Sequence, residues 1–280
     1  MPRSLYSTFG VQKILRPINH SLKIHGLSPT LKNIVEKTSR AFTINLPKNT
    51  QKTLKNDRVL LICNHPAQVD VLLLLASIPP RRKTFLVVMH GLLSILPAIN
   101  KHLIPVYISH RIDNHDQQDW KFKLFQKVHF VPEYSKDTAH QKNIKSISLA
   151  AQKIDEGSLV AIFPAGGTKD ARTFLPGVGY LIKNLKYPKK TKLVMAHVDG
   201  TSAWDFLRII PFVKFFLPKF RVDFSETLNI NNFTKGNGRE ISQKLQQVYD
   251  SWSRPYEPLP KFKYAALYLR SFFLFLLFKG

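Results

Sequence analysis

Short, almost wholly apolar runs recur along the chain, and they constrain its fold more than any other feature. Polar or helix-spaced segments separate them. A strand that is covered on both faces forms such a continuous apolar run, and parallel sheets are covered by helices on both faces. The pattern therefore predicts an α/β fold with a central, largely parallel mixed sheet flanked by helices. The predicted strands are residues 59–63, 85–89, 158–163, 192–198 and 220–224.

Helical patterns flank the predicted strands. Residues 1–45 place apolar side chains at helix spacing, and a further helix is expected over 142–155, ending before Gly157. Residues 110–141 are polar and rich in histidine, which predicts a long surface excursion. We therefore expect an N-terminal helical, membrane-associated segment at 1–57, a main domain at 58–253 and a C-terminal apolar and basic segment at 254–280.

Net charge narrows the class of partner. The 280 residues include 42 Lys and Arg against 18 Asp and Glu, a formal charge of +24. Because 44% of the residues are apolar, a disordered basic tail is excluded. The charge predicts an anionic partner: nucleic acid, a phospholipid surface or a phosphate-bearing substrate. A single cysteine, Cys63, excludes an internal disulfide framework and a multi-cysteine zinc site, and no other convincing metal-ligand set is present.

Two aromatic-rich apolar runs with interspersed cations, 206–220 and 264–278, indicate a phospholipid surface. As a helix the second would reach about 22 Å, short of the roughly 30 Å hydrocarbon core, so we expect it to lie in the membrane interface. The alternative is a terminal helix packed on the core. No run of 18 apolar residues and no secretory signal is present. We therefore expect a peripheral or monotopic protein on the cytoplasmic side of a membrane, not a secreted one.

A histidine and an aspartate follow the first predicted strand, in the stretch N-H-P-A-Q-V-D at 64–70. Open α/β sheets bind ligands at the carboxyl ends of their strands. Pro66 suits the first helical position, which places His65 at or near a helix start. On a regular helix His65 and Asp70 would point about 140° apart, so they meet only if His65 lies on the turn and folds back. Asp70 would then orient one imidazole nitrogen and leave the other as a base; a purely structural pair is the alternative.

A glycine turn follows the predicted strand at 158–163, in the stretch F-P-A-G-G-T-K-D-A-R at 163–172. Gly166 and Gly167 permit a tight turn with exposed backbone N–H groups, and Lys169 and Arg172 add cations nearby. Such a turn at a strand end indicates an anion cradle, with a plain turn as the alternative.

Together these segments resemble the blocks of the glycerolipid acyltransferase family, which includes glycerol-3-phosphate and 1-acylglycerol-3-phosphate acyltransferases. Asn64, His65 and Pro66 through Asp70 match the family's N-H-x-x-x-x-D block. The resemblance covers about residues 58–225 and keeps the family's order of blocks. It implies that the predicted domain at 58–253 is an acyltransferase domain.

The later blocks match less closely. Residues 104–111 look like the second block, an apolar I-P-V strand ending in Arg111. Residues 194–198 stand where the family has its fourth block. The place of its F-P-E-G-T block is taken by Phe163, Pro164, Ala165, Gly166, Gly167 and Thr168. The departures are Ala165 for glutamate, Thr168 for arginine and Ala196 for proline.

The resemblance also implies a mechanism. His65 would act as the general base that deprotonates an acceptor hydroxyl, and Asp70 would stabilise the imidazolium. The acyl donor would be a thioester of coenzyme A or of acyl carrier protein, with no bound cofactor and no metal. Backbone N–H groups at Gly166 and Gly167 would hold developing oxyanion or phosphate charge. The acceptor phosphate would be clamped by Arg111, Lys169 and Arg172.

Three other interpretations compete with this one. A non-catalytic basic protein that binds nucleic acid or membrane through charge alone is the first. Charge would favour nucleic acid, but the aromatic residues cluster in apolar runs and are not interleaved as base-stacking platforms. A catalytically silent, lipid-binding member of the family is kept open by Ala165, although the intact pair of His65 and Asp70 argues against it. An acyltransferase for a non-glycerol lipid differs only in its acceptor. We expect a lipid acceptor, an acyl thioester donor and an anionic membrane surface as partners, and no nucleic acid.

Overall fold

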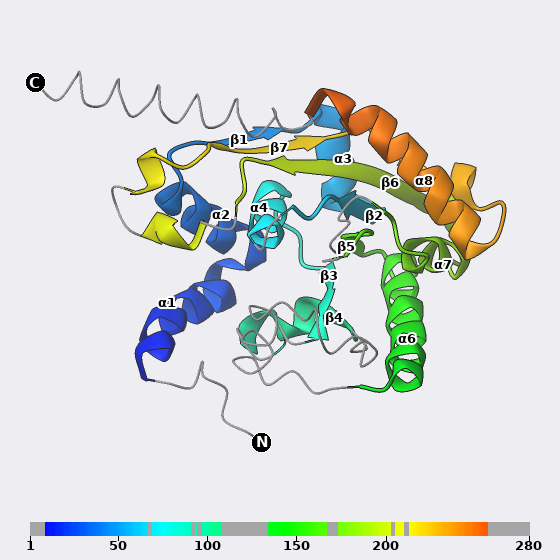
Figure 1. Ribbon diagram of the computed structural model, residues 1–280, viewed down its shortest axis with the longest axis horizontal. Coiled ribbons are helices and arrows are strands. Elements are labelled where there is room, and N and C mark those ends of the chain that lie inside the picture. The colour runs from blue at the N-terminus through cyan, green and yellow to red at the C-terminus, as the bar shows by residue number, and fades with distance from the viewer. Residues whose placement is uncertain are drawn as a thin grey trace, which may run out of the picture.

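The computed structural model describes residues 9–66, 69–90, 93, 97–107, 134–166, 173–202, 205–209 and 213–256 (Figure 1). Its strands are β1 (Phe42–Asn45), β2 (Arg58–Cys63), β3 (Thr84–Met89), β4 (Leu103–Val106), β5 (Leu159–Ile162), β6 (Thr191–Asp199), β7 (Phe220–Phe224) and β8 (Leu228–Asn229). Its α-helices are α1 (Phe9–His25), α2 (Leu27–Thr38), α3 (Lys48–Asn56), α4 (Asp70–Ser77), α6 (Lys136–Asp155), α7 (Gly177–Lys183) and α8 (Gly238–Ser253). Its 3-10 helices are η3 (Pro97–His102), η4 (Pro188–Lys190), η5 (Asp205–Ile209), η6 (Val213–Phe215), η7 (Ile230–Phe233) and η8 (Arg254–Tyr256).

The strands form one sheet in the order β1-β7-β6-β2-β5-β3-β4, and β8 pairs with β6. The pairs β1–β7, β2–β6, β2–β5, β3–β5 and β3–β4 are parallel. Only the pairs of β6 with β7 and β8 are antiparallel within the described residues. The predicted α/β class with a largely parallel mixed sheet is therefore confirmed.

Strand β1 lies within residues 1–45, and the helical prediction is wrong for its four residues. It lies at the edge of the sheet, where it pairs only with β7, and its side chains alternate between half-buried and exposed. Four alternating residues give no apolar run, so the pattern of the central strands does not reveal it. Residues 42–56 thus supply β1 and α3, with the fully buried Leu54, to the sheet and its cover, although they belong to the predicted segment 1–57.

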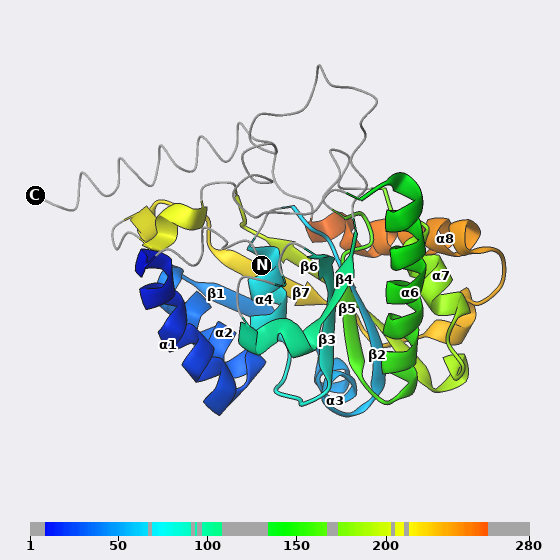
Figure 2. The same ribbon diagram turned by 90° about the horizontal axis from the view of Figure 1, so that it is seen from below.

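Two hydrophobic layers cover the sheet, because successive strand side chains point to opposite faces. Leu60 and Ile62 of β2 pack in the layer formed with α6, α7 and α8. Val59, Leu61 and Cys63 of the same strand pack in the layer formed with α2, α3 and α4. Figure 2 shows α1 and α2 on one side of the strands and α6, α7 and α8 on the other. The central strands are therefore buried on both faces, as their sequences predict.

Helix α6 begins at Lys136, earlier than the predicted start at residue 142. The Ser135 hydroxyl caps the helix by accepting a hydrogen bond from the Thr138 N–H at 3.2 Å. Residues 136–141, assigned to the polar excursion at 110–141, are therefore helical. Polar residues on the exposed face of a helix hid its first turns, because only one face of α6 is covered by the core.

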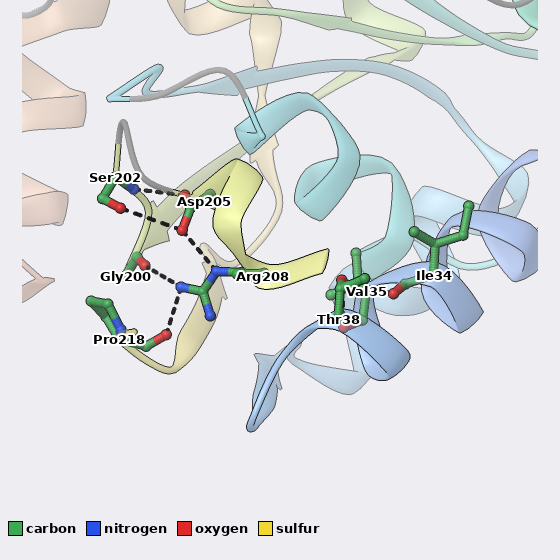
Figure 3. A network of polar contacts seen from close by, with 8 residues as sticks. All are labelled: Ile34, Val35, Thr38, Gly200, Ser202, Asp205, Arg208 and Pro218. Atoms are coloured by element: carbon green, nitrogen blue, oxygen red, sulfur yellow. Dashed lines mark hydrogen bonds and ion pairs between the residues drawn. The ribbon is translucent and has the colours of Figure 1, made fainter. Parts of the chain in front are cut away.

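The loop that follows β6 contains a buried ion pair (Figure 3). The Arg208 Nε lies 2.7 Å from Asp205 Oδ1, and both side chains are almost fully buried. Arg208 Nη2 donates to the carbonyl oxygens of Gly200 at 3.3 Å and Pro218 at 2.8 Å. Arg208 therefore ties the two ends of the loop together. The expectation that the cations of 206–220 lie at a phospholipid surface is therefore wrong for this residue.

Other parts of the run at 206–220 differ in exposure. Phe220 is buried in β7, whereas Phe215 is 50% exposed and lies beside the Lys214 ammonium, 5.6 Å from its ring centroid. The predicted interface helix at 264–278 lies outside the described residues. Among the helices that the structure does describe, none combines the length and the hydropathy needed to cross a membrane.

Candidate active site

His65 and Asp70 meet across the turn that joins β2 to α4. Imidazole Nδ1 of His65 lies 3.2 Å from Oδ2 of Asp70. Helix α4 begins at Asp70, so the expectation that Pro66 occupies its first position is wrong. Because the helix starts later, His65 stands on the turn and folds back over the first helical residues. This is the geometry that a pair five residues apart requires.

Asp70 lies at the start of helix α4, next to the buried thiol of Cys63. Its side chain is fully buried and is the first residue of α4, where the helix dipole favours negative charge. The neighbouring Cys63 thiol has a pKa raised well above its ordinary value, first by burial and then by the charge of Asp70. Cys63 is therefore a neutral thiol of the core rather than a nucleophile. The His65 side chain remains 24% exposed, which leaves the imidazole accessible to substrate.

The first and third blocks lie side by side. The rings of His65 and Phe163 are 4.7 Å apart between centroids and tilted by 31°. Phe163 directly follows β5, and Ile62 of β2 pairs with Ile162 of β5 in parallel register. The chain then turns, because the Gly166 N–H donates to the Phe163 carbonyl oxygen at 3.0 Å with Gly166 at φ +60°. The glycine turn thus starts at the carboxyl edge of the sheet, beside His65.

Ala165 is buried, with 2% of its surface exposed, in the hydrophobic layer below α7 and α8. The methyl group stands where the family's block has glutamate, and a carboxylate buried there without a partner would be costly. Pro164 is also buried, and its carbonyl oxygen accepts a hydrogen bond from the Leu175 N–H at 2.9 Å. The remaining predicted residues, Gly167, Thr168, Lys169, Arg172 and Arg111, lie outside the described residues.

His90 lies in an aromatic cluster directly after β3. Its ring stacks on Tyr107 at 5.1 Å and meets the edge of Tyr134 at 5.5 Å. The Lys142 ammonium lies 4.9 and 5.2 Å from the centroids of these two tyrosine rings. Burial, and secondarily Lys142, lower the pKa of His90, so it is neutral at pH 7. The cluster joins the ends of β3 and β4 to the first turns of α6.

One residue near the turn with His65 could not be identified from the sequence. Tyr249 of α8 places its hydroxyl 3.2 Å from the backbone N–H of Asn64, the residue before His65. The two residues are 185 positions apart, and Tyr249 occupies an ordinary core position of an amphipathic helix. No local pattern separates it from other core aromatic residues.

Comparison with known proteins identifies the family. The model of the acyltransferase family matches residues 43–195, more than half of the chain. The chain belongs to the acyltransferase family. A search of the curated proteins found no match. Among solved structures, the 1-acyl-sn-glycerophosphate (LPA) acyltransferase PlsC from Thermotoga maritima is similar with a TM-score of 0.44 and 12% sequence identity, over 89% of this chain and 83% of that one.

Family membership gives the enzyme class, acyl transfer, and agrees with the resemblance found in the sequence blocks. The match spans β2, the turn with His65 and Asp70, β5 and the glycine turn. It ends within β6, so α8 and the loop with Arg208 lie beyond it.

Proposed function

We propose that this acyltransferase moves a fatty acyl group from an acyl thioester to the hydroxyl of glycerol-3-phosphate or of a lysophospholipid such as 1-acylglycerol-3-phosphate. The donor is a thioester of coenzyme A or of acyl carrier protein. The proposal needs no bound cofactor and no metal. The observation that carries it is the 3.2 Å contact of His65 with Asp70 at the carboxyl edge of the sheet.

In the proposed reaction His65 is the general base. Asp70 engages Nδ1, so Nε2 accepts the proton of the acceptor hydroxyl while its oxygen attacks the thioester carbonyl carbon. The tetrahedral intermediate collapses with cleavage of the C–S bond, and the imidazolium returns its proton to the departing thiolate. The buried charge of Asp70 stabilises the imidazolium between these two steps. Backbone N–H groups of the turn that begins at Gly166 are the candidates for holding the oxyanion.

The acceptor phosphate is proposed to bind Arg111, Lys169 and Arg172. Their positions in the sequence support this. The turn at 163–172 starts beside His65, after β5, and the segment ending in Arg111 follows β4, which lies two strands from β5 in the sheet. The buried methyl of Ala165 favours a second candidate, an acceptor other than a glycerolipid, since the family's glutamate is missing beside the turn.

A membrane surface is the proposed site of action. The net charge of +24 and the exposed Phe215 beside Lys214 support binding to anionic lipid. The N-terminal segment 1–57 and the apolar run 264–278 are proposed to contribute, the latter as an interface helix. The face towards the cytoplasm and a peripheral or monotopic attachment belong to the same proposal.

A matrix of donors and acceptors tests the proposed function. Acyl-CoA and acyl carrier protein donors are combined with glycerol-3-phosphate, 1-acylglycerol-3-phosphate, other lysolipids and a non-glycerol lipid alcohol, and product is measured by mass spectrometry. We expect acylation of a phosphate-bearing glycerol acceptor by the wild type and its loss in His65→Ala at unchanged melting temperature. Wild-type rates in His65→Ala would refute the base, and turnover of only the non-glycerol acceptor would move the assignment to the second candidate.

A further inference from the structure

The backbone of β2 stops pairing with β6 one residue before the turn with His65. The parallel register of the two strands ends where Cys63 lies opposite Ala196. Beyond this point the side-chain amide of Asn64 replaces the backbone ladder. Its Oδ1 accepts from the Val198 N–H at 2.7 Å, and its Nδ2 donates to the Val198 carbonyl oxygen at 2.9 Å. The chain can therefore leave the strand while it stays attached to β6.

Tyr249 contacts the backbone of Asn64. Its hydroxyl accepts the Asn64 N–H at 3.2 Å and donates to the Ala196 carbonyl oxygen at 2.8 Å. The hydroxyl thus bridges β2 and β6 at the point where their ladder ends. The side chain is 5% exposed, and burial raises the pKa of Tyr249 well above its ordinary value, so the proton that it donates stays in place. His197 Nδ1 is a third neighbour of this hydroxyl, at 3.3 Å.

Helix α8 also holds the end of the glycine turn. The side-chain Oε1 of Gln246, one helical turn before Tyr249, accepts the Phe174 N–H at 3.0 Å. The rings of Phe174 and Tyr249 are 5.5 Å apart between centroids. Phe174 comes shortly after Arg172 in the sequence. Gln246 and Tyr249, one helical turn apart on α8, therefore hold the main chain after the glycine turn and at the turn with His65. Helix α8 lies outside residues 43–195, which the family model matches.

We infer that Tyr249 and Asn64 are positioning residues for acyl transfer, and that they act on the catalytic His65 through the main chain of the turn. The inference rests on the proposed role of His65 as the general base. Asn64 makes three hydrogen bonds to groups of β6 and α8, and each restrains the peptide that leads directly into His65. The proton acceptor must stay within hydrogen-bond reach of the substrate hydroxyl.

A purely structural role makes a different prediction. Loss of a buried hydroxyl that bridges two backbone groups lowers the melting temperature wherever it occurs, because the donor and the acceptor both lose their partner. Only loss of a hydroxyl that holds the turn should also displace the imidazole. A displacement of about 1 Å, caused from outside the chemistry, can lower the rate about 100-fold.

The chain offers a matched control on the same helix. The Ser242 hydroxyl of α8 also accepts from one backbone N–H, that of Gly179 at 3.0 Å, and donates to one carbonyl oxygen, that of Leu175 at 3.2 Å. None of these bonds involves Asn64. Tyr249→Phe and Ser242→Ala therefore remove the same kind of bridge from α8, the first at the turn with His65 and the second between the end of the glycine turn and α7.

The test measures melting temperature, kcat and KM for wild type, Tyr249→Phe, Asn64→Ala and Ser242→Ala, with a lysophosphatidate acceptor and an acyl-CoA donor. Nitrogen-15 NMR of the His65 imidazole reports its tautomer and its contact with Asp70. We expect similar losses of melting temperature in Tyr249→Phe and Ser242→Ala. The value of kcat should fall about 10- to 100-fold in Tyr249→Phe, with unchanged KM and shifted His65 signals, and stay near wild type in Ser242→Ala.

Two results are separable from this outcome. If His65→Ala is inactive but Tyr249→Phe keeps the kcat of Ser242→Ala and unshifted His65 signals, the positioning role is refuted and the proposed base stands. If His65→Ala retains wild-type kcat, the proposed base is refuted instead. Asn64→Ala provides a second test, since it removes both bonds to Val198, and full kcat in this variant would also overturn the inference.

Discussion

Asp70→Asn tests the charge at the centre of the proposed site while it preserves the shape of the side chain. The carboxylate is fully buried and contacts Nδ1 of His65 at 3.2 Å. An amide there carries no charge, and its NH2 group donates to Nδ1. The imidazole proton would then move to Nε2, the nitrogen that must accept the proton of the substrate. The change therefore removes both the stabilisation of the imidazolium and the tautomer that can act as a base.

The size of the effect follows from the distance. Two unit charges 3.2 Å apart attract by about 5 kcal/mol at an effective dielectric constant of about 20. Because the His65 side chain is 24% exposed, water screens part of this attraction. We therefore take about 3 kcal/mol as the stabilisation of the imidazolium that Asp70→Asn removes. Each 1.36 kcal/mol in the barrier is about a factor of ten, so kcat should fall at least about 100-fold. The wrong tautomer raises the loss further, towards the roughly 10⁴-fold known for the same change in a Ser-His-Asp triad.

The assay is release of free thiol from acyl-CoA at saturating acceptor, measured for wild type, Asp70→Asn and Asp155→Asn. Asp155 is the control because its carboxylate also accepts hydrogen bonds, from the N–H groups of Lys186 and Tyr187. It lies at the end of α6, before β5 begins, and so away from the carboxyl ends of the strands. We expect normal kcat in Asp155→Asn and a melting temperature of Asp70→Asn close to that of the control. A folded Asp70→Asn variant with kcat within threefold of wild type would refute the role of the pair.

Two further predictions concern stability. Gly179→Ala should lower the free energy of unfolding by about 3 kcal/mol or more in urea titrations, because its Cβ would lie 1.8 Å from the Gly238 carbonyl oxygen. The control Gly177→Ala should be neutral, because its Cβ would make only an ordinary contact at 3.7 Å. Equal urea midpoints for the two variants would contradict the close crossing of α7 and α8. Burial is the chief cause that lowers the pKa of His197 below 6.5, so the native state binds fewer protons than the unfolded state and stability is lost as pH falls below about 6.5. Between pH 7.5 and 5.5, His197→Gln should show a smaller loss in urea midpoint than wild type, and substitution of the exposed His140 by Gln should leave the loss unchanged.

Much of the candidate site could be predicted because its residues are close in sequence. His65 and Asp70 share one turn, and the requirement that His65 fold back over the helix start follows from helix geometry alone. The point where α4 begins could not be predicted in the same way. Pro66 fits a first helical position, yet the helix starts at Asp70, where the carboxylate gains from the helix dipole and from His65.

The environment of Arg208 could not be predicted from the sequence. Its place among aromatic residues in the run 206–220 predicts a cation at a membrane interface. In the fold its guanidinium is buried against Asp205 and two carbonyl oxygens, because the loop must return from β6 to β7. Sequence gives the charge of a side chain, but its environment depends on which distant groups the loop brings together.

The sequence by itself determined the α/β class, the central strands of the sheet, the family and the pair of His65 and Asp70. These follow from apolar runs and short spacings, which are local properties. The tertiary structure alone decided that β1 joins the sheet edge, that Phe163 lies against His65, and that Tyr249 reaches Asn64 from α8. Such contacts depend on strand order and on hydrogen bonds between residues far apart in the chain, and no local pattern encodes them.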